Sequence, residues 1–146
     1  MGASGIVRDI IAGALSIAAF VLPSVGCAGE LNFYEHNGSV IAWFVALGEV
    51  KATYETPRRG LEAIGVREGS VLFTGHEESD RITGTAYAFK KGCKPAPYKV
   101  VGRNLGDQMV LRGPAPVRAK GKCTVERYTL DSPNADLVFK FSSNHH

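Results

Sequence analysis

Short runs of apolar and β-branched residues, separated by polar turn residues, recur between residues 70 and 116 of this 146-residue chain. The runs near 70–75, 81–90, 97–102 and 107–112 have the length and composition of β-strands. They also form a weak internal repeat, in which a run ending in glycine leads through a polar link to a second run ending in glycine. Consecutive hairpins of this kind predict an antiparallel meander that can close into a barrel.

A Pro-Ala-Pro sequence occurs twice, at 95–97 and at 114–116. Proline has no amide hydrogen and cannot donate to a central ladder of hydrogen bonds. Both segments are therefore predicted to be connections between hairpins.

A hairpin is also predicted around Gly48-Glu49, which separates the apolar run 39–47 from a second run at 50–55. Glycine in the first of two turn positions indicates a type II′ turn. This turn predicts a core face of three opposed pairs, which are Leu47 with Val50, Val45 with Ala52, and Trp43 with Tyr54.

The other face of this hairpin is solvated through Lys51, Thr53 and Glu55, yet it also carries a row of apolar residues around Phe44. A contiguous apolar patch on an outer face can bind a partner. Scattered exposed apolar side chains are, however, ordinary in proteins. Phe44 is therefore one candidate binding residue.

The C-terminal part of the chain adds two predicted strands, at 122–130 and 137–141. Counted from Val40, the strands number eight, and eight strands close into a barrel whose interior holds side chains or one small ligand. The expected fold is all-β, an antiparallel up-and-down barrel. Strand 81–90 alternates small with large residues, and the alternation leaves open which set faces the interior.

The first 28 residues have the pattern of an export signal, which predicts a signal helix before the barrel. Arg8 precedes an uncharged apolar run at 10–22, and small residues follow up to Ala28. The run is shorter than the roughly 20 residues of a membrane-spanning helix. Cleavage after Ala28 would leave 29–146 as a single barrel domain, and an uncleaved anchor helix is the alternative.

Cys27 adds a second interpretation of this segment. Val25-Gly26-Cys27 resembles the end of a bacterial lipobox, although Ser24 stands where leucine is usual. A lipoprotein signal would end before Cys27, and the lipid on Cys27 would then be the only membrane contact. The expected location is periplasmic or secreted, with or without this anchor.

Cys93 and Cys123 remain as a pair after cleavage. Two cysteines in an exported chain indicate a disulfide, and this one would close a loop worth roughly 3–4 kcal/mol. Free thiols or metal ligands are the alternative, but no further soft ligand lies near them in the sequence.

The long connection 57–69 contains Arg58, Arg59 and Arg67. Its apolar residues Leu61, Ile64 and Val66 predict a short helical turn that plugs one end of the barrel. Paired arginines can clamp a carboxylate or phosphate, so the three are candidate anion-binding residues. The alternative is that they are solvated or pair with Glu62 and Glu68.

Composition and motifs favour a binding protein over an enzyme. Lys and Arg number 17 against 14 Asp and Glu, and the basic residues are scattered, which does not indicate nucleic-acid binding. No phosphate loop, dinucleotide motif or Gly-x-Ser-x-Gly is present, and no cofactor or catalytic residue is predicted. His36 and His76 are the only histidines before the C-terminal pair His145-His146, and the acidic segment 76–80 lacks the spacing of an organised metal site.

Several segments together resemble a group of small exported bacterial proteins of unassigned function. These segments are HNGS, YETPRRGL, VLFTG, RITGTAYAF, PYKVVG and LRGPAP, together with Cys93 and Gly65-Val66. In architecture the chain is also similar to calycin-like barrels and to periplasmic inhibitors of lysozyme or proteases. The lysozyme inhibitors carry a Ser-Gly-x-x-x-Tyr loop, of which Gly84-Thr85-Ala86-Tyr87 would at most be a remnant within a strand.

The expected function is that of an exported, non-enzymatic envelope protein that binds a small ligand or another protein. Inhibition of an envelope hydrolase is one alternative, and hydrolysis through His36 or His76 is another. A roomy cavity favours ligand binding, whereas a filled barrel with a rigid protruding loop favours inhibition.

Overall fold

The computed structural model describes residues 2, 13, 14, 16–21 and 28–142. Cys27 and most of the predicted signal peptide lie outside the described residues. The lipidation of Cys27 and the cleavage of the signal peptide therefore stay predictions. Residues 16–21 are exposed and form no helix. Among the described residues, no helix is both long and apolar enough to cross a membrane.

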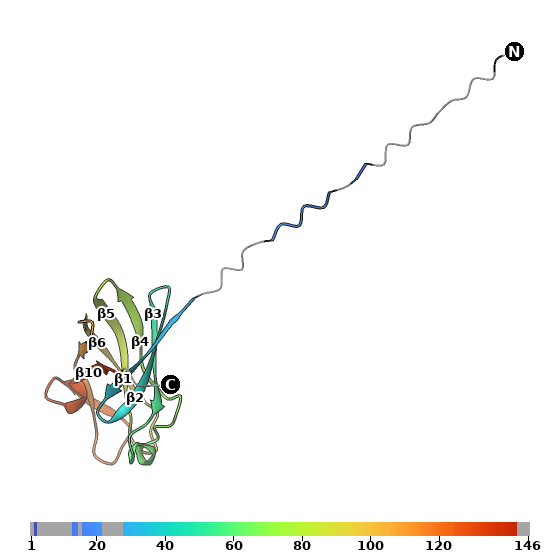
Figure 1. The fold of residues 1–146 in the computed structure, drawn as a ribbon. Helices are drawn as coiled ribbons and strands as arrows, with labels where there is room; N and C mark the ends of the chain where they lie inside the picture. Colours follow the sequence, from blue (N-terminus) through green and yellow to red (C-terminus); the bar gives the residue numbers. More distant parts are fainter. Residues whose placement is uncertain (1, 3–12, 15, 22–27, 143–146) are drawn as a thin grey trace.

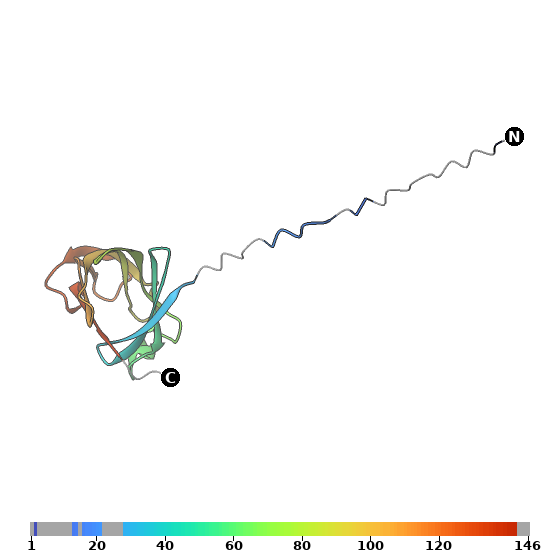
Figure 2. The ribbon, with the colours of Figure 1, turned by 45° about the horizontal axis from the view of Figure 1, so that its top comes forward.

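Eight antiparallel strands close into a barrel in the part of the chain that the structure describes, as Figures 1 and 2 show. Neighbours along the chain pair in space from the first strand to the seventh, and the last strand closes the ring between the first and the seventh. The barrel strands are β1 (Glu30–His36), β2 (Ser39–Ala46), β3 (Glu49–Thr56), β4 (Val71–Glu78), β5 (Arg81–Ala88), β6 (Ala96–Asn104), β7 (Gln108–Arg112) and β10 (Asp136–Phe141).

A small two-stranded sheet interrupts the barrel between β7 and β10. It consists of β8 (Ala115–Arg118) and β9 (Val125–Thr129), and the 3-10 helix η2 (Pro133–Ala135) leads from it into β10. The number of barrel strands was predicted correctly, but one member was wrong. Strand 122–130 lies outside the ring in β9, and its place is taken by β1, which the sequence did not predict.

Both Pro-Ala-Pro segments lie partly in strands, which corrects their prediction as connections. Pro97 is in β6 opposite Tyr87 of β5, and Pro116 is in β8 opposite Tyr128 of β9. At Pro97, β6 has no partner on its other side, because its pairing with β7 begins only at Val101. Proline is tolerated at such an edge, because no neighbouring strand needs its missing amide hydrogen. The same holds for Pro116, because β8 and β9 are both edge strands of their two-stranded sheet.

The β2–β3 hairpin has the predicted core face but a different register. Its turn is Leu47-Gly48 rather than Gly48-Glu49, so that Val45 lies opposite Val50 and Trp43 opposite Ala52. Leu47 and Gly48 have φ angles of 51° and 80°, the pair of positive values that a type I′ turn requires. Leu47 therefore leaves the predicted core position and is 85% exposed.

The centre of the barrel is filled with aromatic and branched side chains. Phe73 and Trp43 stack with their ring centroids 5.4 Å apart, and Phe139 meets Trp43 edge to face. The Phe73 ring covers Gly75 and Gly84, where an added Cβ would come within 2.5 and 2.7 Å of its Cζ atom. The small residues of β5 therefore face the interior, which settles the orientation of this strand.

The predicted plug is present as η1 (Leu61–Ile64) in the β3–β4 connection. Val66, which follows it, is 1% exposed in the core, and Leu61 and Ile64 pack against the core from one end of the barrel.

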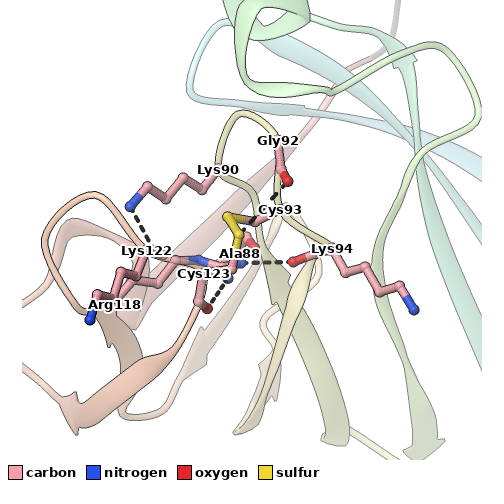
Figure 3. Close-up of a disulfide and its surroundings, with 8 residues drawn as sticks. All are labelled: Ala88, Lys90, Gly92, Cys93, Lys94, Arg118, Lys122 and Cys123. Carbon is pink, nitrogen blue, oxygen red and sulfur yellow. Dashed lines mark hydrogen bonds between the residues drawn. A yellow bond between two sulfur atoms is a disulfide. The ribbon is translucent and has the colours of Figure 1, made fainter.

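Cys93 and Cys123 form the predicted disulfide, which joins the β5–β6 connection to the link between β8 and β9 (Figure 3). Arg118 lies beside the bridge and donates hydrogen bonds to the carbonyl oxygens of Cys123 at 2.7 Å and Lys94 at 2.8 Å. Disulfides persist in oxidising compartments, so the bridge is compatible with a location outside the cytosol.

Candidate functional site

The two ends of the barrel are built differently. At one end, short turns join β2 to β3, β4 to β5, and β6 to β7. At the other end lie the short β1–β2 turn and three longer connections, which carry the plug, the disulfide and the β8–β9 sheet and cover this end. The first end therefore stays open, and we refer to its cavity of about 530 Å³ as the mouth.

Polar side chains on the inward faces of three strands line the mouth. Glu30 and Asn32 extend from β1, Glu77 from β4 and Asn104 from β6. The Asn32 amide donates to Glu30 Oε1 at 2.7 Å, and the Asn104 amide donates to Glu77 Oε1 at 2.9 Å. Each carboxylate is thus oriented by one neutral donor.

Aromatic side chains form the floor and one wall of the mouth. Tyr34 lies between Trp43 and Phe141, with centroid distances of 6.1 and 5.8 Å and edge-to-face geometry. Trp43 is 2% exposed, and its indole N–H has no hydrogen-bond partner among the described residues. Such an unpartnered buried donor costs about 1–3 kcal/mol, which a ligand or water acceptor would relieve.

The mouth has a negative electrostatic character. No Lys or Arg belongs to its lining, and neither Glu30 nor Glu77 makes a salt bridge within the described part of the chain. The pKa of the Tyr34 hydroxyl is raised, first by burial and then by the negative charges of Glu77 and Glu30. Both carboxylates therefore act on the aromatic floor of the same cavity.

The opposite end contains a much smaller and more enclosed cavity of about 140 Å³, which His36, Ser39, Tyr54 and Tyr98 help to line. His36 Nδ1–H donates to the Val138 carbonyl at 2.9 Å, and its Nε2 lies 3.4 Å from the amide nitrogen of Asn37. Ser39 Oγ accepts from the backbone N–H of Arg58 at 2.8 Å. His36 and Ser39 therefore have structural partners and do not form a nucleophile–base pair with each other.

We expect His36 to make the fold sensitive to acid. Its pKa is lowered because burial disfavours the charged ring, and this outweighs the opposing effects of the Val138 carbonyl and Glu35. Below pH 6.5, its ordinary pKa, the unfolded chain therefore binds a proton that the folded chain does not. The free energy of unfolding should fall there by up to about 1.4 kcal/mol per pH unit, until His36 titrates in the folded state.

Urea unfolding of His36→Gln across this pH range tests the effect, because glutamine is neutral in both states. The variant should lose this acid-dependent component, whereas the exposed control His76→Gln should keep it. An unchanged pH slope in His36→Gln would show that other groups cause the acid sensitivity.

His76 and its acidic neighbours alternate across β4. His76 lies on the outer surface, 3.5 Å from Glu49 Oε1, and Glu78 is also exposed, whereas Glu77 points into the mouth. Strand geometry thus separates residues that are adjacent in sequence. Among the described residues, no three His, Cys, Asp or Glu side chains converge in a way that could hold a metal ion.

The other candidate residues from the sequence lie away from the mouth. Arg58 borders the enclosed cavity, and Arg59 and Arg67 are exposed on the same connection. None of the three makes a salt bridge to a described residue, and anion binding there stays a prediction. Phe44 is 42% exposed on the outer face of β2, opposite Leu31 and Lys51 and in contact with Gly29.

The mouth does not follow from the sequence pattern. Glu30 and Asn32 precede the first predicted strand, and Glu77 belongs to the acidic segment 76–80. The only signal in the sequence was the alternation of residues from Glu30 to His36. Its inward residues Glu30 and Asn32 are polar, so this part of the strand resembles a solvent-exposed face.

The fold and the mouth together define a closed antiparallel β-barrel with a filled centre and one open, acidic and aromatic end. This architecture is compatible with that of calycin-like barrels. Comparison of the chain with protein-family models, curated proteins and solved structures finds no match. The resemblance to small exported bacterial proteins therefore stays a prediction.

Proposed function

We propose that this chain is an exported, non-enzymatic binding protein that receives a small ligand, or a side chain of a protein partner, in the mouth. The observation that carries the proposal is the cavity of about 530 Å³ at one end of a barrel whose centre is filled. A concave site with an apolar floor and a few oriented polar groups is typical of ligand binding. The disulfide supports export, because such bonds are stable in oxidising compartments.

Trp43 makes the proposal testable, because it is the only tryptophan in the chain and it lines the mouth. We expect small molecules that bind there to change its fluorescence and to raise the melting temperature of the protein. A set of metabolite-sized cations, anions and neutral compounds would be titrated against three proteins. These are the wild type, Asn32→Phe, which fills the mouth, and Thr83→Phe, which places the same ring on the outer face of β5.

Binding should be lost in Asn32→Phe and kept in Thr83→Phe. The mouth would be excluded as the binding site if no compound changed Trp43 fluorescence. It would also be excluded if Asn32→Phe responded to the compounds like the wild type.

Inhibition of an envelope hydrolase is the second candidate, and the turn at Leu47 favours it. Leu47 is apolar, 85% exposed and held at φ 51°, a left-handed conformation that costs a non-glycine residue about 1–2 kcal/mol. Strained, exposed residues on rigid turns are often contact residues. An inhibitor would insert this turn into its target, and Leu47→Asn would then weaken inhibition while relieving the strain.

A further inference from the structure

We propose that the group bound in the mouth is an organic cation, a guanidinium or an alkylammonium, held between the carboxylates of Glu30 and Glu77 and the aromatic floor of Tyr34 and Trp43. This inference rests on the proposed function of the mouth as a binding site. It adds the chemical class of the ligand, which the fold alone does not give.

The charge of the lining excludes anions and favours cations. Glu30 and Glu77 each use Oε1 to accept from an asparagine amide, and no described residue donates to their Oε2 atoms. Two carboxylates with free acceptor positions and no basic neighbour are stabilised by a bound positive charge.

The aromatic floor favours an organic cation in particular. Cations are attracted to the faces of tryptophan and tyrosine rings, most strongly in sites that are withdrawn from water. The Trp43 indole N–H is buried without a described partner, and Trp43 is one of the residues that line the mouth, so a ligand acceptor that reaches this donor would satisfy it. The two carboxylates and the aromatic residues line one cavity.

A metal ion suits the same lining poorly. Hard cations such as Ca²⁺ take six or more oxygen ligands, and Mg²⁺ requires a near-ideal octahedron. Only two carboxylates line the mouth, and no three metal-binding side chains converge among the described residues. An organic cation needs fewer oxygen contacts and gains from the aromatic wall.

The cation can be a free small molecule or a side chain of a protein partner. Exposed apolar residues lie at this end of the barrel: Phe141 lines the mouth, and Leu47 and Leu105 lie in the turns at the same end, with exposed fractions of 50%, 85% and 55%. An apolar rim around a polar pocket would add contacts to residues that flank a partner's arginine or lysine. A free cation would leave the rim unused.

The test uses probes that differ only in charge. N-acetyl-arginine amide carries a guanidinium, whereas N-acetyl-citrulline amide is its uncharged counterpart of nearly the same shape. We expect the arginine probe to change Trp43 fluorescence saturably and the citrulline probe to bind at least about tenfold more weakly. Equal binding of the two probes would overturn the cation inference and leave the mouth as a binding site. Failure of both probes would overturn it too, and the response to the wider compound set then decides whether the proposed function also fails.

Isosteric variants assign the effect to the two carboxylates. Glu30→Gln and Glu77→Gln should each weaken the arginine probe about tenfold without changing the citrulline probe. Glu78→Gln, one residue further along β4 and outside the barrel, is the matched control and should bind like the wild type. Loss of binding in all three variants, or in none, would contradict a role for Glu30 and Glu77.

A second pair of probes distinguishes the source of the cation. A blocked peptide with arginine between two leucines should bind more tightly than the blocked amino acid if the natural cation belongs to a protein. Leu47→Ser should then remove this gain without affecting the blocked amino acid. Equal affinities for peptide and amino acid would identify a free small molecule as the ligand.

Discussion

Replacing Phe73 with alanine is expected to lower the free energy of unfolding by about 3–5 kcal/mol, towards the upper end for a buried aromatic residue. Phe73 is fully buried, stacks on Trp43 and covers Gly75 and Gly84. Truncation would leave a cavity beside two residues that have no side chain to move into it. The cost of a cavity depends on how far its walls can collapse, and the wall at Gly75 and Gly84 is backbone.

Urea denaturation followed by circular dichroism measures the effect without relying on Trp43, whose fluorescence would itself change. Phe73→Leu is the matched control, because leucine still covers part of the glycine pair, and its loss should be clearly smaller. A Phe73→Ala variant destabilised by less than about 2 kcal/mol would mean that the barrel closes over the missing ring.

This packing arrangement explains why the face of β5 could not be predicted. Alternation shows that Gly84, Ala86 and Ala88 share one side of the strand, but it does not say whether that side is crowded or empty. The answer depends on Phe73 of the neighbouring strand β4, whose ring lies over Gly75 and Gly84 and occupies the space that the glycines leave. Such a contact joins residues that no local pattern relates.

The missing strand β1 has a related cause. Its inward residues change from polar Glu30 and Asn32 at the mouth to Tyr34 and His36 deeper in the barrel, while Leu31 and Phe33 face outward. A barrel with an open polar end thus reverses the usual distribution of apolar and polar residues where the strand enters the site. The polar inward residues that form the mouth are therefore the reason why β1 was not predicted.

Other features followed from local rules and were predicted correctly. The disulfide followed from a single cysteine pair in a chain with a predicted export signal, and the plug followed from three apolar residues in a polar connection. The register predicted for the β2–β3 hairpin was wrong, because the turn places Leu47 in a left-handed conformation that a leucine rarely adopts. The core face survived this error because the register changed by an even number of residues.

Removing the disulfide is expected to produce the second large loss of stability. Cys93 and Cys123 are 30 residues apart, and a loop of this length contributes about 3–4 kcal/mol through the entropy of the unfolded chain. The double variant Cys93→Ser, Cys123→Ser should lose this amount in urea denaturation. Probe binding at the mouth should persist under native conditions, because the bridge lies at the opposite end of the barrel.

Arg118 should make the loss non-additive. Its guanidinium donates to the carbonyls of Cys123 and Lys94, so it clamps the two segments that the disulfide joins (Figure 3). With the bridge intact, Arg118→Met should cost about 1–2 kcal/mol, because its charge-assisted hydrogen bonds to the carbonyls of Cys123, Lys94 and Ala88 are lost while the segments stay together. Without the bridge, the same change should cost less if the segments have already separated, and more if Arg118 alone then holds them. A double-mutant cycle gives the sign, and strict additivity within about 0.5 kcal/mol would show that the two clamps act independently.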